Sequence, residues 1–194
     1  MATAVLSLGV LGAAPATAST TVTAPQPGPP PLLHVPAAVR PAAVPAGAAL
    51  VEHKCAVIFE TASKSEESVH CADVWMFSEG TTNLIWGGNE VLCQTPAGAL
   101  RDCVSIREHS ELSSPEFATR TQSGICGTAV GHSDCGARRV ENVTGSIGVN
   151  PFGDFVCSFA GIASDDIVET SDGTTAAGTV TSNIFDTACS MQVI

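Results

Sequence analysis

The stretch Val-His-Cys-Ala-Asp-Val-Trp-Met-Phe at residues 69–77 decides the fold class of this chain. Successive side chains of an extended strand point to opposite sides of a sheet, so this stretch would present two faces. Its two faces would carry Val69, Cys71, Asp73, Trp75 and Phe77, and His70, Ala72, Val74 and Met76. Both faces are largely apolar, which is typical of a strand that is covered on both sides. The pattern therefore predicts a central strand.

Further segments rich in valine, isoleucine, phenylalanine and threonine recur along the chain, which favours strands over helices. The other predicted strands are Cys55–Thr61, Asn83–Trp86, Glu90–Gln94, Cys103–Glu108, Phe117–Thr121, Arg139–Val149, Phe155–Ile162, Thr174–Thr181 and Ile184–Cys189. Many short strands separated by turn residues are typical of a sandwich or a barrel. We therefore expect an all-β fold, a disulfide-stapled antiparallel β-sandwich or small barrel.

The segments between these strands predict the connections. The polar run at 63–67 lies between two apolar stretches and predicts a hairpin, while Gly87-Gly88-Asn89 and Ser171-Asp172-Gly173 tolerate positive φ and predict turns. Ser-Ser-Pro-Glu at 113–116 has a capping residue followed by proline, which predicts a short helical turn over Ser113–Ala118.

Eight cysteines follow residue 54, at Cys55, Cys71, Cys93, Cys103, Cys126, Cys135, Cys157 and Cys189. An even number in an exported chain indicates a disulfide framework, although eight cysteines allow 105 pairings. Short turn-like segments separate Cys93 from Cys103 and Cys126 from Cys135, so each pair would staple a hairpin. The remaining pairs in this sequential pattern are Cys55–Cys71 and Cys157–Cys189.

Metal binding is the competing use of cysteine. No two cysteines have the C-x₂₋₄-C spacing of zinc ligands, and the nearest substitute is Cys126, His132 and Cys135. Thiolates would be oxidised outside the cell, so we expect neither a metal nor a cofactor.

Two non-globular segments precede the predicted domain. The apolar run Ala4–Ala14 is shorter than the ~20 residues of a membrane-spanning helix, and Ala16-Thr17-Ala18 follows it as a cleavage signature. We therefore expect a signal peptide at 1–18 and no stable membrane insertion after its removal. Most of the 12 prolines lie within 19–48, which predicts a disordered Pro/Ala-rich linker or a removed pro-segment before a disulfide-rich β domain at 49–194.

The charge of the chain excludes whole classes of partner. It carries 19 acidic against 8 basic residues, for a net charge of −11. Nucleic acids and anionic membrane surfaces are bound by basic patches, so neither is an expected partner. We interpret the acidity as a source of solubility outside the cell, and the alternative is a specific cationic partner.

The sequence offers little support for a catalytic site. His70-Cys71, with Cys55 before it, resembles the histidine loop of trypsin-like serine proteases over residues 55–71. Ser68 and Val69 stand where that family has small residues, and its Gly-Asp-Ser-Gly-Gly nucleophile loop is absent. A catalytic triad needs the base, the orienting acid and the nucleophile together. We therefore expect His70 to be a strand residue, and Trp75 and Trp86 to be core residues rather than a carbohydrate platform.

These observations favour a secreted, non-enzymatic extracellular binding or structural module, whose partner would be an extracellular protein or surface. The first alternative is a secreted protease inhibitor that presents Arg101 or Arg138-Arg139, each of which lies close to a cysteine. The second alternative is a small extracellular hydrolase.

Overall fold

The computed structural model describes residues 34–61, 65–127, 139–169 and 175–190. Within these ranges the chain is all-β and contains no apolar helix of membrane-spanning length. The strands are β1 (Ala49–Glu60), β2 (Glu67–Glu79), β3 (Thr82–Gln94), β4 (Leu100–Arg101), β5 (Ser105–Ser113), β6 (Arg120–Gly127), β7 (Arg139–Val143), β8 (Ile147–Val149), β9 (Phe155–Glu169), β10 (Thr175–Thr181) and β11 (Phe185–Cys189).

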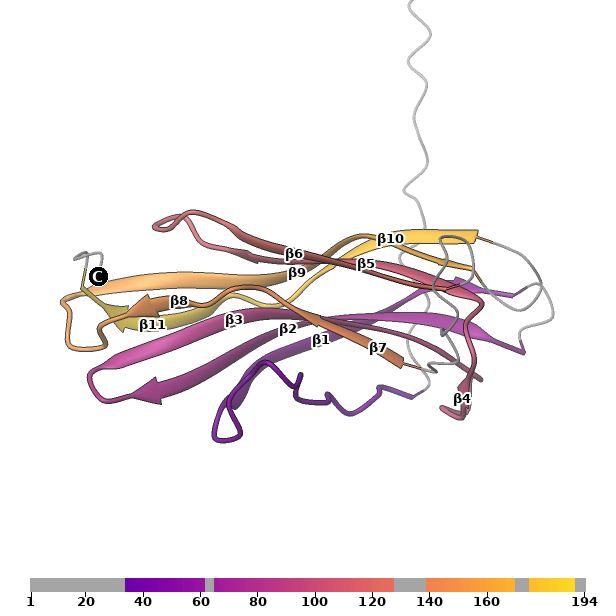
Figure 1. Cartoon of the computed structure of the whole chain (residues 1–194), viewed down its shortest axis with the longest axis horizontal. Coiled ribbons are helices and arrows are strands. Elements are labelled where there is room, and N and C mark those ends of the chain that lie inside the picture. Colours follow the sequence, from indigo (N-terminus) through magenta and orange to yellow (C-terminus); the bar gives the residue numbers. More distant parts are fainter. Residues whose placement is uncertain (1–33, 62–64, 128–138, 170–174, 191–194) are drawn as a thin grey trace, which may run out of the picture.

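The strands form two antiparallel sheets that lie face to face and curl into a half-barrel (Figure 1). The first sheet has the order β1-β2-β3-β4, with β7 and β8 also paired to β3. The second sheet has the order β10-β9-β5-β6, and β11 pairs with β9. The expected all-β antiparallel fold is confirmed, and β2 is central between β1 and β3, as residues 69–77 predicted.

The hairpin predicted at 63–67 is confirmed, because β1 and β2 pair antiparallel on either side of it. Two other predicted connections are wrong. The structure has no turn at Gly87-Gly88-Asn89, where β3 runs on and pairs Gly87 with Val74. The predicted helical turn at Ser113–Ala118 is a bend, in which the Ser114 hydroxyl donates to the carboxylate of Glu116 at 2.8 Å instead of capping a helix. The predicted turn at 171–173 lies outside the described residues.

The segment predicted as one strand over 139–149 is divided into β7 and β8. The division lies at Thr144, whose amide donates to the Gly87 carbonyl at 2.9 Å and whose hydroxyl accepts from the Gly87 amide at 3.1 Å. These bonds satisfy buried polar groups where the strand pairing is interrupted.

The main core lies between the two sheets. Its buried members are Val74, Ile85, Leu112, Ile147, Val149, Cys157, Phe159 and Cys189. Phe117 stacks on Phe159 with ring centroids 5.8 Å apart, so the bend after β5 closes one side of this core.

Two glycines allow the backbones of the facing sheets to approach closely. A Cβ atom on Gly161 of β9 would lie 2.2 Å from the carbonyl oxygen of Asp73 in β2. A Cβ on Gly87 of β3 would lie 2.6 Å from the carbonyl oxygen of Glu111 in β5. Both distances are shorter than any van der Waals contact, so no larger residue fits without movement of the backbone.

Residues 34–48 form an N-terminal strap that packs on the outer face of the first sheet, away from the second sheet (Figure 1). Val44 is 1% exposed and packs with Trp75 and Trp86, which confirms both tryptophans as core residues. The amides of Val44 and Ala48 donate to the carbonyls of Pro41 and Pro45, each at 3.0 Å. This part of the predicted linker is therefore packed, because its prolines form tight turns that present an apolar side chain to the sheet. Residues 1–33 lie outside the described ranges.

Substitution Val44→Asp is expected to detach the strap. Burial of a valine side chain contributes about 1.5–3 kcal/mol, and a carboxylate cannot be buried between two indole rings without a partner. Tryptophan emission should therefore shift to longer wavelength while the sheets stay folded by circular dichroism. The matched control is Val39→Asp at a half-exposed position of the same strap. An unchanged spectrum for Val44→Asp would contradict the packing.

Candidate functional site

Three disulfides are present in the described residues, Cys55–Cys71, Cys93–Cys103 and Cys157–Cys189. Strand register brings Cys55 opposite Cys71, and the β3–β4 hairpin brings Cys93 and Cys103 together. The Cys126–Cys135 pair lies outside the described part of the chain. Three intramolecular bridges fit an oxidising, extracellular environment.

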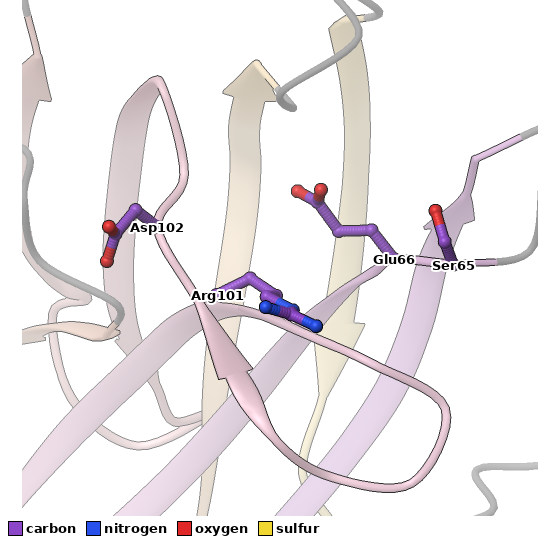
Figure 2. A pocket seen from close by; sticks show the side chains of 4 residues that line it. All are labelled: Ser65, Glu66, Arg101 and Asp102. Atoms are coloured by element: carbon purple, nitrogen blue, oxygen red, sulfur yellow. The ribbon is translucent and has the colours of Figure 1, made fainter.

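A polar pocket of about 350 Å³ lies beside the Cys93–Cys103 hairpin and is lined by Ser65, Glu66, Arg101 and Asp102 (Figure 2). Its four side chains are spread around the pocket rather than converging on one point (Figure 2). Arg101 is exposed, but its backbone belongs to β4 and pairs with Cys93. An inhibitor must offer a free extended loop to the protease, so this geometry adds no support to the inhibitor hypothesis, which stays a prediction. Arg138 lies outside the described residues, and the side chain of Arg139 is not described.

A serine–histidine pair lies in the interior. The Ser68 hydroxyl and Nε2 of His70 are 2.9 Å apart, on neighbouring positions of one face of β2. Both residues are 0% exposed, so no substrate can reach the pair in this arrangement. From the sequence, Ser68 was only a departure from the protease pattern, although the i, i+2 spacing of a strand could have suggested its contact with His70. His70 is a strand residue beside Cys71, as predicted.

A second histidine joins the strap to the first sheet. Nδ1 of His53 is 2.6 Å from the Asp73 carboxylate, and Nε2 is 3.1 Å from the carbonyl oxygen of Pro36. Both ring nitrogens of His53 therefore contact oxygen atoms, one on β2 and one on the strap. His53 also lies 3.2 Å from the sulfur of Cys55. In the described residues, one group of side chains has potential metal-ligand atoms close together: His53, Cys55 and Cys71. Its two sulfur atoms are joined in a disulfide.

Four large apolar side chains beside the β9–β11 ladder are more than half exposed: three lie where β9 begins, and Ile184 lies just before β11, near Ala160 at the opposite end of that ladder. Phe152 is 79% exposed, Phe155 57%, Val156 64% and Ile184 66%. We call these four residues the apolar end. Register places β11 beside β9 here, with Val156 opposite Ala188 and Ser158 opposite Asp186. A small cavity of about 200 Å³ adjoins them and is lined by Ser113, Pro115, Ser158, Phe159, Ala160 and Ile184.

Carboxylates surround the apolar end. Asp154 precedes Phe155 and is exposed, and Asp186 is exposed and accepts from the Ser158 hydroxyl at 2.7 Å. Glu116 is also exposed, and one of its carboxylate oxygens lies 3.2 Å from the backbone nitrogen of Ser158. The apolar surface therefore has an acidic rim, which disfavours anionic partners and favours cationic ones.

The backbone of β9 is incompletely paired at this end. β5 pairs with β9 from Ser113, opposite Ala160, to Ser105, opposite Glu169. β11 pairs with Phe155–Phe159 on the other side. Among the described residues, no strand therefore pairs with residues 155–159 on the β5 side. The amide of Ser158 points to that side, because it meets the Glu116 side chain there.

The apolar end was not among the sites predicted from the sequence. The signal was present in Pro-Phe-Gly-Asp-Phe-Val at 151–156, where large apolar residues flank Gly and Asp. A sequence does not show that such residues stay uncovered, because exposure depends on which strand lies beside them. Comparisons of the chain with protein-family models, with curated proteins and with solved structures found no match.

Proposed function

We propose that the protein is a secreted, non-enzymatic binding module that docks a cationic, apolar segment of a partner protein on its apolar end. The single observation that carries this proposal is the exposure of four large apolar side chains beside the β9–β11 ladder, each more than half exposed. Clustered apolar surface of this kind, rimmed by polar groups, is typical of interaction sites.

The acidic rim decides between classes of partner. Asp154, Asp186 and Glu116 lie around the apolar end, and the whole chain carries a net charge of −11. Anionic membranes, nucleic acids and a second copy of the chain would all bring negative charge to this surface. A protein segment with lysine or arginine beside apolar residues would instead meet opposite charge at the rim and burial at the centre.

The two cavities described above and the Ser68–His70 pair give no support to a catalytic alternative. The polar pocket at Arg101 is open and its side chains do not converge, and the Ser68–His70 pair is sealed from solvent. The cavity at the apolar end is small and lined by apolar side chains and two serines. Such a cavity can accept a side chain but holds no pair of groups for acid–base chemistry.

Panning of a random-peptide display library against the immobilised protein tests the proposal. We expect enrichment of peptides that combine apolar residues with lysine or arginine, and affinity that falls as salt rises. Val156→Asp and Ile184→Asp should weaken binding about tenfold or more, because each removes the burial of one aliphatic side chain.

The matched control for panning is Val35→Asp, which alters an exposed valine of the strap. This variant should bind the selected peptides as well as the original protein does. The proposed function would be contradicted if the library yielded no enriched peptide, or if the selected peptides bound the Val156→Asp variant as tightly as the original protein.

A further inference from the structure

We infer that the partner segment binds as an added β-strand on the open edge of β9 at residues 155–158, where it displaces the Glu116 carboxylate. This inference rests on the proposed function and specifies the geometry by which the apolar end would bind. Addition of an extended segment to a sheet edge uses backbone hydrogen bonds for affinity and alternate side chains for specificity.

The alternation of β9 shows which backbone groups face the open side. Gly161 exchanges hydrogen bonds with Ser182 on the β10 side, where its carbonyl accepts from the Ser182 amide at 2.9 Å. Residues two apart in a strand direct their backbone groups to the same side. Ser158 and Val156 are an odd number of residues from Gly161, so their backbone groups face the opposite side. Their amides therefore point away from β11 and toward the path that β5 would follow if it continued beyond Ser113.

The Glu116 side chain stands where a neighbouring strand would place a carbonyl oxygen. It accepts from the Ser158 amide at 3.2 Å and from the Ser114 hydroxyl at 2.8 Å. An edge amide bonded by a side chain is easier to release than one in a ladder, because the exposed Glu116 side chain can rotate while the bend stays packed through Phe117 on Phe159. Once released, the carboxylate would be available to an incoming lysine or arginine.

The surfaces above and below this edge select the side chains of the added strand. Val156 is exposed on the outer face of the sheet, and the 200 Å³ cavity lies next to it along the edge, between Pro115 and Ile184. One apolar side chain would cover Val156 and another would enter the cavity. The occupant is therefore an extended segment in which apolar residues alternate with basic ones.

Pairing with a second copy of the chain is the competing use of an edge. A symmetric pair would bring Asp154, Glu116 and Asp186 of both copies together, with a net charge of −11 on each. Like charges across an interface are unfavourable, so the edge favours a basic partner over itself.

The test uses a blocked synthetic hexapeptide that alternates lysine and valine, titrated into the full chain. The expected result is binding that protects the amides of Val156 and Ser158 from hydrogen exchange. Val156→Pro removes the amide on the open side without removing a ladder bond. It should weaken binding about tenfold, since a backbone hydrogen bond and the fit of the strand are both lost.

The matched control is Val156→Ala, which keeps the amide and loses only side-chain contact, so it should bind more tightly than Val156→Pro. A peptide alternating glutamate and valine should not bind. Equal binding by the proline and alanine variants would overturn strand addition. The docking proposal, which panning tests, would be unaffected by that result. A dimer in sedimentation that Val156→Pro abolishes would overturn the choice of a basic partner. Failure of every panned peptide to bind would overturn both proposals.

Discussion

Substitution Gly161→Ala is expected to lower the free energy of unfolding by about 3 kcal/mol or more, the upper range for overpacking of a well-packed interior. Its Cβ would lie 2.2 Å from the carbonyl oxygen of Asp73 and 2.9 Å from the carbonyl carbon. The obstacle is backbone of a central strand, which cannot rotate away as a side chain can. Relief requires β9 and β2 to separate, and this loosens the core around Phe159 on one side of the contact. Urea unfolding followed by circular dichroism measures the loss.

The matched control is Gly145→Ala, because a Cβ at Gly145 meets nothing within 4 Å. It should change stability by less than about 0.5 kcal/mol, as is usual for surface substitutions. If the two variants unfold at the same urea concentration, the backbones of the sheets do not touch at Gly161 and the described packing is wrong.

The second large effect is expected from loss of the Cys157–Cys189 disulfide. This bridge closes a loop of 32 residues, against 10 for Cys93–Cys103. The chain-entropy model assigns about 3.7 kcal/mol to the longer loop and about 2.7 kcal/mol to the shorter. Both Cys157 and Cys189 are fully buried in the main core, so the double substitution to alanine also removes packed sulfur atoms. Denaturant unfolding without reductant should show a lower free energy of unfolding for this variant than for a variant that lacks Cys93–Cys103.

The comparison variant carries alanine at Cys93 and Cys103. A larger loss for this variant than for the one without Cys157–Cys189 would show that loop closure and core burial do not govern these bridges. Thiol titration of each denatured variant checks that the remaining cysteines stay paired.

The strand content and the central position of β2 were predictable, because they follow from alternation within a few residues. The two largely apolar faces of residues 69–77 required a cover on each side, and the strap and the second sheet provide it. The turn predicted at Gly87-Gly88-Asn89 failed for a tertiary reason. Gly87 serves the close approach of β3 to β5 rather than a change in chain direction, and local propensity cannot distinguish the two uses.

The composition of residues 34–48 did not predict their packing either. Proline-rich segments are extended when nothing covers them, and the packing of Val44 on Trp75 and Trp86 with the contact of Pro36 to His53 gives this segment a surface to bind. The candidate site was hidden for a related reason. The open edge at Val156 exists because β5 stops at Ser113 while β9 continues, and strand ends are the least predictable feature of a sequence.

The described disulfides have a consequence for how the molecule tolerates stress. Cys55–Cys71 and Cys157–Cys189 each join neighbouring strands within one sheet, and Cys93–Cys103 closes a hairpin. None of these three disulfides links one sheet to the other, so the sheets can separate while all three bonds stay intact. A chain opened in this way keeps its hairpins aligned and can close again without any exchange of sulfur partners. Refolding after a brief exposure to denaturing conditions therefore requires only that the two sheets pack together again and exclude water.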